Sequence, residues 1–254
     1  MATAGSGKAR SRTSDTYARI RDDVILGHFA PGSKLKIEAL RERYGLGATP
    51  IREALSMLTA DGLVERVDQR GFRVAEVSSG EFEELLAIRC NIEERALRLA
   101  MERGSEEWEE AIVLARYRLA RTPRLGPDGS TKDLEWENCH KGFHMALTSA
   151  CGSPILLRLC NQLYDENNRY RCIARLNPSA RPNIYDEHEE IAEAVLARDA
   201  DLAVRLIVEH YTTTGRLLHA ALCSREEAAA LKDQSAAAKA GPGHRAATRN
   251  PERV

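Results

Sequence analysis

The spacing of apolar and polar positions predicts three helices near the start of the chain. Apolar residues recur with helical spacing from Ser14 onward, until Pro31-Gly32 ends the pattern. A second, short helix is predicted over 37–44 and closes at a glycine. Thr49 is expected to cap a third helix, because threonine is a good N-cap and the following Pro50 is favoured at the first helical position.

A β-hairpin is predicted directly after the third helix, which ends at Asp61-Gly62. Residues 63–67 form a strand-like run, 68–71 carry a turn sequence, and 72–77 alternate between apolar and polar side chains. Three helices followed by a two-stranded wing is the order of a winged helix-turn-helix domain. We expect this domain over residues 14–77, preceded by a flexible arm over 1–13.

The rest of the chain shows helical spacing only, so an all-α bundle is predicted over residues 78–223 and the fold class is mainly α. Ser78 with Glu81 three residues later is a capping-box signature, which starts a long helix to about Arg103. Further helices are predicted over 106–121, 131–150, 153–176, 183–198 and 200–222. From residue 224 the chain is alanine-rich and then charged, and a disordered tail is expected over 224–254.

Composition and charge distribution narrow the class of protein. The chain has 254 residues, of which 43% are hydrophobic and 30% charged, as in ordinary soluble domains. It has no long apolar run and no signal-peptide core at its start, so we expect a cytoplasmic protein without a membrane partner. Residues 1–77 hold 13 Lys and Arg against 10 Asp and Glu, the sign expected of a DNA-binding domain on an acidic remainder.

Four of the seven histidines form a pattern typical of a metal site between helices. His140 and His144 are four residues apart and project from one helix face. His188 and His210 fall on two later helices, and imidazoles from three helices can converge on one first-row metal ion. The alternative is that the four histidines are ordinary helix residues that bind no metal. A zinc-hydrolase motif is absent, because Ala192 stands where its second histidine belongs.

The first domain resembles the N-terminal domain of the GntR family of transcription regulators. The resemblance is carried by Pro31–Leu35, Gly45–Leu55, Asp61–Val64 and Arg70–Val74. It implies a third helix in the major groove of DNA, with Arg52 reading a base and Thr49 touching phosphate. Arg70 and Gly71, at the tip of the wing, would approach the minor groove. An alternative for Arg52 is a surface ion pair with a glutamate such as Glu38 or Glu42.

One departure from the GntR pattern affects the DNA contacts. Many members carry Ser-Arg-Thr-Pro where this chain has Gly47-Ala48-Thr49-Pro50. The missing arginine removes one expected DNA contact. DNA binding is still expected, but the operator sequence does not follow from the resemblance.

The second domain resembles the C-terminal FCD domain of the FadR-type branch of the same family, over residues 80–222. The matching motifs are Arg89-x-x-x-Glu93, Phe143-His144, Ser153–Leu156, Glu187-His188, Ala197-x-Asp199 and Glu209-His210. In that domain an Asp-x-x-Phe-His motif and two later histidines hold a metal at the floor of an effector pocket. The resemblance therefore implies His144, His188 and His210 as ligands. His140 stands where the usual aspartate would be, and histidine can also ligate.

The ligand chemistry predicts which metal and which effector such a site takes. Nitrogen ligands favour Zn, with Ni or Co as alternatives, over Mg, Ca or Mn. Neutral imidazoles leave the charge of the ion uncompensated, so an open coordination position would attract a small carboxylate. Arg89, Arg171 and Arg175 are the candidate effector-binding residues. For Arg89, a structural salt bridge to Glu93 is an equal alternative.

These features predict a metal-containing DNA-binding transcription regulator, a repressor that senses a small carboxylate, and not an enzyme. A homodimer is expected, because one winged helix reads only half of a palindromic operator. One alternative is a constitutive DNA-binding protein whose helical domain is purely structural. A metal-dependent hydrolase that uses the histidines is the other.

Overall fold

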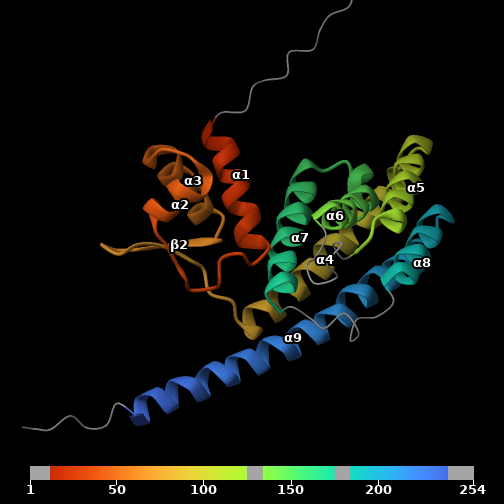
Figure 1. Cartoon of the computed structure of the whole chain (residues 1–254). Coiled ribbons are helices and arrows are strands. Elements are labelled where there is room, and N and C mark those ends of the chain that lie inside the picture. The colour runs from red at the N-terminus through yellow and green to blue at the C-terminus, as the bar shows by residue number, and fades with distance from the viewer. Residues whose placement is uncertain (1–11, 125–133, 175–183, 240–254) are drawn as a thin grey trace, which may run out of the picture.

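The computed structural model describes residues 12–124, 134–174 and 184–239, which form a small head (12–77) and a larger helical body (78–239) (Figure 1). The head comprises α1 (Arg12–Ile25), β1 (Lys34–Leu35), α2 (Ile37–Tyr44), α3 (Ala48–Ala60), β2 (Val64–Val67) and β3 (Gly71–Val74). The body comprises α4 (Ser79–Arg103), α5 (Glu106–Arg121), α6 (Leu134–Thr148), a 3-10 turn (Ser149–Cys151), α7 (Pro154–Ala174), α8 (Ile184–Leu196) and α9 (Ala200–Lys239). The mainly α fold predicted from the sequence is confirmed.

The head is held together by one apolar face from each helix, packed over a small sheet. Ile20, Ile51, Leu55 and Leu58 are fully buried between α1 and α3. The sheet is antiparallel with strand order β1-β3-β2, and the predicted hairpin pairs Val67 with Gly71. The third strand, β1, was not predicted, because two residues are too few to show an alternating pattern.

The start of α3 differs from the prediction that Thr49 caps this helix. The helix begins at Ala48, and Gly47 occupies the cap position with extended backbone and no side-chain hydrogen bond. Thr49 already lies within the first turn, where its hydroxyl cannot serve as the N-cap. By contrast α2 ends as predicted, at Gly45, whose backbone is left-handed (φ 67°) and whose amide donates to Arg41 O at 2.9 Å.

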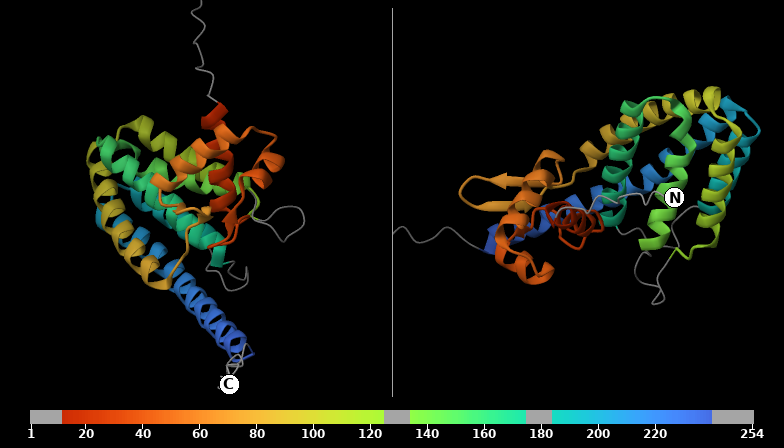
Figure 2. Two further views of the ribbon diagram at one scale, coloured as in Figure 1. Left: turned by 90° about the vertical axis from the view of Figure 1, so that its left-hand side faces the viewer. Right: turned by 90° about the horizontal axis from the view of Figure 1, so that it is seen from above.

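The body is a bundle in which the long helix α4 packs against α7 and α9 (Figures 1 and 2). Ser78 caps α4 as predicted, since its hydroxyl accepts from the Glu81 amide at 3.1 Å. The largest fully buried side chains of the bundle core are Trp136, Phe143, Leu97, Ile112, Leu119, Leu147 and Ile191. Their burial fixes the relative positions of the helices that carry the histidines.

The last helix is longer than the sequence pattern indicated. We expected helix only over 200–222 and a disordered tail from 224, but α9 continues to Lys239 and extends beyond the other helices of the body (Figures 1 and 2). The tail prediction is therefore wrong over 224–239, where alanine, the best helix former, outweighs the lack of apolar periodicity. Residues 240–254 and 1–11 lie outside the described residues, and the two further residues assigned to the arm are already helical in α1.

Two further features of the described residues concern membranes and cysteines. In the described ranges, the structure has no helix with the length and hydropathy needed to cross a membrane. All six cysteines are free; Cys151, Cys160 and Cys172 are buried and the other three are half-buried.

Candidate metal centre and nucleic-acid interface

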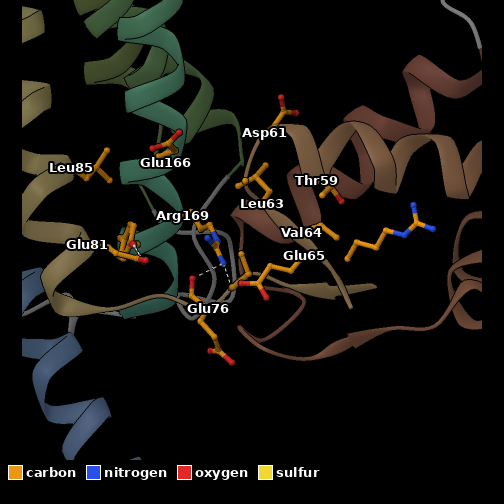
Figure 3. Close-up of a pocket in the computed structure, with 14 residues that line it drawn as sticks. Thr59, Asp61, Leu63, Val64, Glu65, Glu76, Glu81, Leu85, Glu166 and Arg169 are labelled. Carbon is orange, nitrogen blue, oxygen red and sulfur yellow. Dashed lines mark hydrogen bonds between the residues drawn. The ribbon is translucent and has the colours of Figure 1, made fainter. Parts of the chain in front are cut away.

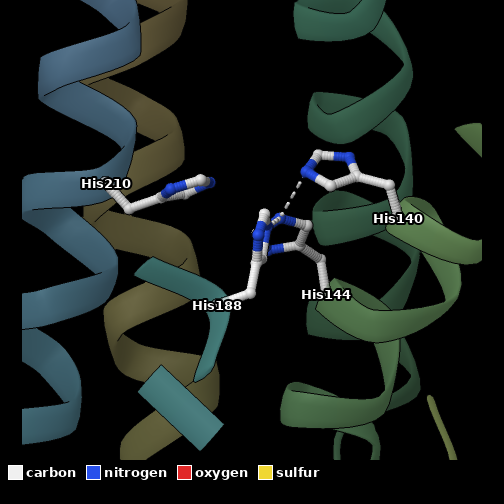
Figure 4. A group of neighbouring side chains, drawn as sticks. All are labelled: His140, His144, His188 and His210. Carbon is white, nitrogen blue, oxygen red and sulfur yellow. Dashed lines mark hydrogen bonds between the residues drawn. The ribbon is translucent and has the colours of Figure 1, made fainter. Parts of the chain in front are cut away.

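Four histidines from three helices meet in the interior of the body (Figure 4). Helix α6 supplies His140 and His144, α8 supplies His188, and α9 supplies His210. All four are buried, and one ring nitrogen of each lies within 4.8 Å of those of the others. The Nε2 atom of His144 is 3.2 Å from Nε2 of His140 and 3.4 Å from Nε2 of His188. The structure thus brings together every histidine that the sequence singled out.

Two of these rings are oriented by acceptors on their outer nitrogens. Nδ1 of His144 lies 3.0 Å from the Tyr211 hydroxyl, which itself donates to Glu93. Nδ1 of His210 lies 2.5 Å from Glu187 Oε2. With the proton held at Nδ1, each ring keeps a lone pair at Nε2, the form in which histidine ligates a metal.

His140 is oriented differently from the other histidines. Its Nδ1 lies 2.6 Å from the Tyr164 hydroxyl and 3.2 Å from Arg171 Nη1. A guanidinium only donates, so Nδ1 accepts here and the ring proton sits on Nε2, facing His144. Trp136 stacks flat on this ring, with centroids 4.7 Å apart at 15°. His140 must change tautomer before its Nε2 can ligate, a step that His144 and His210 do not need.

Burial favours the uncharged form of His140, His144 and His210. Desolvation lowers the pKa of His140 and His144 well below the usual range, and the charges of neighbouring histidines and arginines add to this. For His210, desolvation and the charges of Arg89 and Arg171 lower the pKa to about 3. Neutral imidazole is the form that binds a metal ion, so these residues are ready to ligate at neutral pH without losing a proton.

Two of the three predicted effector arginines lie beside the cluster. Arg89 bonds Glu93 (Nε to Oε1, 2.6 Å), so the predicted alternative of a salt bridge is what the structure contains. Its guanidinium also lies 3.9 Å from the ring centroid of Tyr211. Arg171 is ion-paired with Glu137 and faces the His140 ring. Arg175 lies outside the described residues.

Three aromatic residues of the site were not singled out in the sequence. Trp136, Tyr164 and Tyr211 contact the histidine rings directly. Helical spacing offered a signal, because Tyr164 and Arg171 are seven residues apart on one face of α7. A second signal was that Tyr211 directly follows His210, a predicted ligand. Neither signal was decisive, because aromatic residues are frequent in protein cores.

The residues predicted to contact DNA are exposed on the head. Thr49 and Arg52 lie in the first turns of α3. Within the residues that the structure describes, the Arg52 side chain forms no ion pair, so the alternative pairing with Glu38 or Glu42 is not observed. Arg70 and Gly71 are exposed at the tip of the β2–β3 hairpin, where the backbone of Gly71 is left-handed (φ 91°). These groups are available to an external partner.

Comparison with known proteins matches one family to the head and a second to the body. Residues 12–74 match the bacterial regulatory proteins of the gntR family, and residues 84–213 match the FCD domain. The HTH-type transcriptional repressor GlaR of Escherichia coli (strain K12) is 38% identical over 204 residues, which cover 78% of this chain and 92% of that protein. The HTH-type transcriptional regulator BphR of Paraburkholderia xenovorans (strain LB400) is 37% identical over 205 residues, or 79% and 82%.

Among solved structures, E. coli McbR/YncC has the same fold, with a TM-score of 0.70 and 22% identity over 83% of this chain and 98% of that one. The resemblance predicted from sequence motifs is confirmed, and so is the prediction that the protein is not an enzyme, since the matching proteins are transcription regulators. The chain is a DNA-binding transcriptional regulator and belongs to the gntR family, in which it carries an FCD domain.

Proposed function

We propose that this regulator is a repressor whose histidine cluster holds one divalent transition metal, zinc first and nickel or cobalt as alternatives. The observation that supports this is the spacing of the Nε2 atoms, 3.2 Å and 3.4 Å. A tetrahedral zinc ion with Zn–N bonds of about 2.0–2.1 Å separates its ligand nitrogens by about 3.3 Å. The residues present therefore fit a metal, with His144, His188 and His210 as ligands and His140 as the fourth once its tautomer changes.

The proposed effector is a small carboxylate. A metal held by His144, His188 and His210 alone would supply positive charge and, as long as His140 is not bound to it, an open fourth position, both of which attract a carboxylate. Within the part of the chain that the structure describes, two buried donors, Arg89 Nη2 and Arg171 Nε, have no hydrogen-bond partner. A buried unsatisfied donor costs about 1–3 kcal/mol, so a carboxylate that accepts from either atom removes that penalty. Arg175 is kept as a third candidate from the sequence.

The proposed DNA target is a palindromic operator bound by a homodimer. A single head presents one recognition helix, which reads one half-site. Large apolar side chains are exposed on the body, notably Ile155 on α7 (62%) and Ile88 on α4 (51%), and a second copy would cover them. Sedimentation of the full chain tests this assembly: a dimer is expected, and a monomer at micromolar concentration contradicts it. Repression is inferred from the name of the relative GlaR.

Elemental analysis of protein purified without chelators tests the metal proposal. We expect about one transition-metal ion per chain in the wild type, and loss of that ion in His188→Ala. His219→Ala is the control, because His219 lies on α9 outside the cluster. If the wild type holds no metal and gains none with zinc, nickel or cobalt, the proposal is wrong. Footprinting with and without candidate carboxylates separates a sensor from a constitutive DNA-binding protein.

A further inference from the structure

Helix α7 faces the histidine cluster with one line of side chains. Tyr164, Asn168 and Arg171 share a face, at spacings of four and three residues. The Tyr164 hydroxyl lies 2.6 Å from His140 Nδ1, and Arg171 is held by Asn168 Oδ1 at 2.7 Å while it faces the same ring. All three are buried. A change in the position of His140 must therefore be accommodated by this face of α7.

The adjacent line of side chains on α7 contacts the head. Asp165 follows Tyr164 directly and pairs with Arg21 of α1. The same carboxylate accepts from Lys141 Nζ at 2.7 Å and 2.8 Å. Because Lys141 follows His140 on α6, one buried carboxylate joins the head to both helices that border the cluster.

Arg169, one turn after Asp165, holds the segment that connects head and body (Figure 3). Its Nη2 donates to the backbone carbonyls of Ala75 and Glu76, directly after β3. The side chain is 6% exposed and, in the part of the chain that the structure describes, has no carboxylate at ion-pair distance. It lines a cavity of about 690 Å³ between head and body. On this side the two parts are therefore tied by hydrogen bonds across an open space, not by close packing.

We propose that α7 transmits the state of the histidine cluster to the DNA-reading head, with Asp165 and Arg169 as the positioning residues. This inference rests on the proposed metal site. Successive residues of a helix are separated by about 100° around its axis, so a rigid helix that turns to re-aim Tyr164 and Arg171 turns the neighbouring line equally. The Arg21 pair and the linker carbonyls then move with it, which alters the orientation of the head. Such a helix is a two-state element that both sites bias.

Hydrogen–deuterium exchange of the full chain, with and without zinc, tests this coupling in the absence of any identified effector. Coupling between sites corresponds to about 5–150-fold in an equilibrium, so we expect zinc to change exchange by at least about five-fold in α1 and in residues 71–78 of the wild type. In Asp165→Asn/Arg169→Met, zinc content and the response of α6 and α8 are expected to remain, while the response of α1 and 71–78 is lost. Both single variants are measured too, so the test stands if the double variant does not fold.

Arg158→Met is the matched control, since Arg158 is an exposed arginine on the same helix. It is expected to keep the full response. If the double variant or the single variants retain the response of the head, the coupling through α7 is wrong. If the wild type takes up zinc and only the body responds, the coupling is wrong and the metal site stands. If the wild type takes up no zinc, the metal site itself is wrong and the coupling falls with it.

Discussion

The head and the body of this regulator use charged side chains in opposite ways. In the head, Arg52 and Arg70 are exposed and accessible to a partner outside the chain. In the body, Arg89 and Arg171 are buried and each is held by a carboxylate of the same chain. The difference shows that the exposed charges of the head depend on where the backbone places each residue, whereas the histidine cluster depends on which residues from distant segments surround it.

Two ion pairs with the same separation make the contrast measurable. Arg73 and Glu65, across the hairpin, lie 2.6 Å apart with both side chains about two-fifths exposed. Arg89 and Glu93, inside the body, also lie 2.6 Å apart but are 4% and 2% exposed. Water screens the first pair and stabilises its partners when the pair is broken. It cannot reach the second, so loss of one partner leaves a buried charge.

The largest predicted effect follows from this difference. Glu93→Leu should lower the free energy of unfolding by about 3–5 kcal/mol, because the Arg89 guanidinium loses its partner in a dry interior. Glu65→Leu, the matched control in the head, should lower it by about 0.2–1 kcal/mol. Urea denaturation of the metal-free proteins measures both. If both variants lose the same free energy of unfolding, burial does not make the Arg89–Glu93 pair more important for stability than the Arg73–Glu65 pair.

Zinc should stabilise the body and not the head. A ligand that binds only the folded state at a thousand times its dissociation constant adds about 4 kcal/mol. We expect zinc to raise the unfolding temperature of the wild type and of His219→Ala, and to leave that of His210→Ala unchanged. Thermal unfolding followed by Trp fluorescence measures this, because Trp136 stacks on His140 inside the cluster. A zinc response in His210→Ala equal to that of the wild type would contradict a role for His210 as a ligand.

The same contrast explains which parts of the structure were predictable. The ends of α2 and α4 agree with the pattern, because each helix stops at a glycine, Gly45 and Gly104. The histidines were found because spacing within α6 and recurrence on later helices are visible in the sequence. The extension of α9 to Lys239 was missed, since alanine-rich sequence without an apolar stripe resembles a tail.

The outer partners of the histidines could not be predicted, for a physical reason. The proton position on His144 depends on Tyr211, and that hydroxyl depends on Glu93, more than a hundred residues earlier in the chain. No local pattern encodes a contact between α4 and α9. The hydrogen bond from Arg171 to the Nδ1 atom of His140, which fixes the tautomer of that ring, likewise becomes visible only when α6 and α7 are packed together.

In the head, Arg52→Ala should weaken specific DNA binding by about 1–3 kcal/mol and relax the preference for one base in each half-site. The guanidinium is exposed on the recognition helix, and bidentate contact with guanine accounts for a loss of this size. Titration of DNA selected by the wild type from a random pool, and of scrambled DNA, measures it. As a control, Arg158→Ala, which changes an exposed residue of the body, should leave the affinity for both DNAs unchanged. If Arg52→Ala loses the same affinity for both DNAs, Arg52 contacts phosphate and not a base.

The smallest effect concerns the start of the recognition helix, where Gly47 occupies a cap position without a side-chain hydrogen bond. Its backbone (φ −72°, ψ 167°) suits serine, and an added Cβ would meet only Pro50 Cδ at 3.9 Å. Gly47→Ser should therefore stabilise the protein by a few tenths of a kcal/mol, since a serine hydroxyl can accept from an amide of the first turn.

Gly45→Ser, two residues earlier, is the matched control with the opposite sign. An added Cβ would meet nothing there within 4 Å, but the left-handed backbone (φ 67°) costs an L-residue roughly 1–2 kcal/mol. The same substitution should thus raise the midpoint of denaturation at one glycine and lower it at the other. If both variants shift the midpoint in the same direction, the geometry assigned to the start of α3 is wrong, and with it the placement of Thr49 inside the first turn.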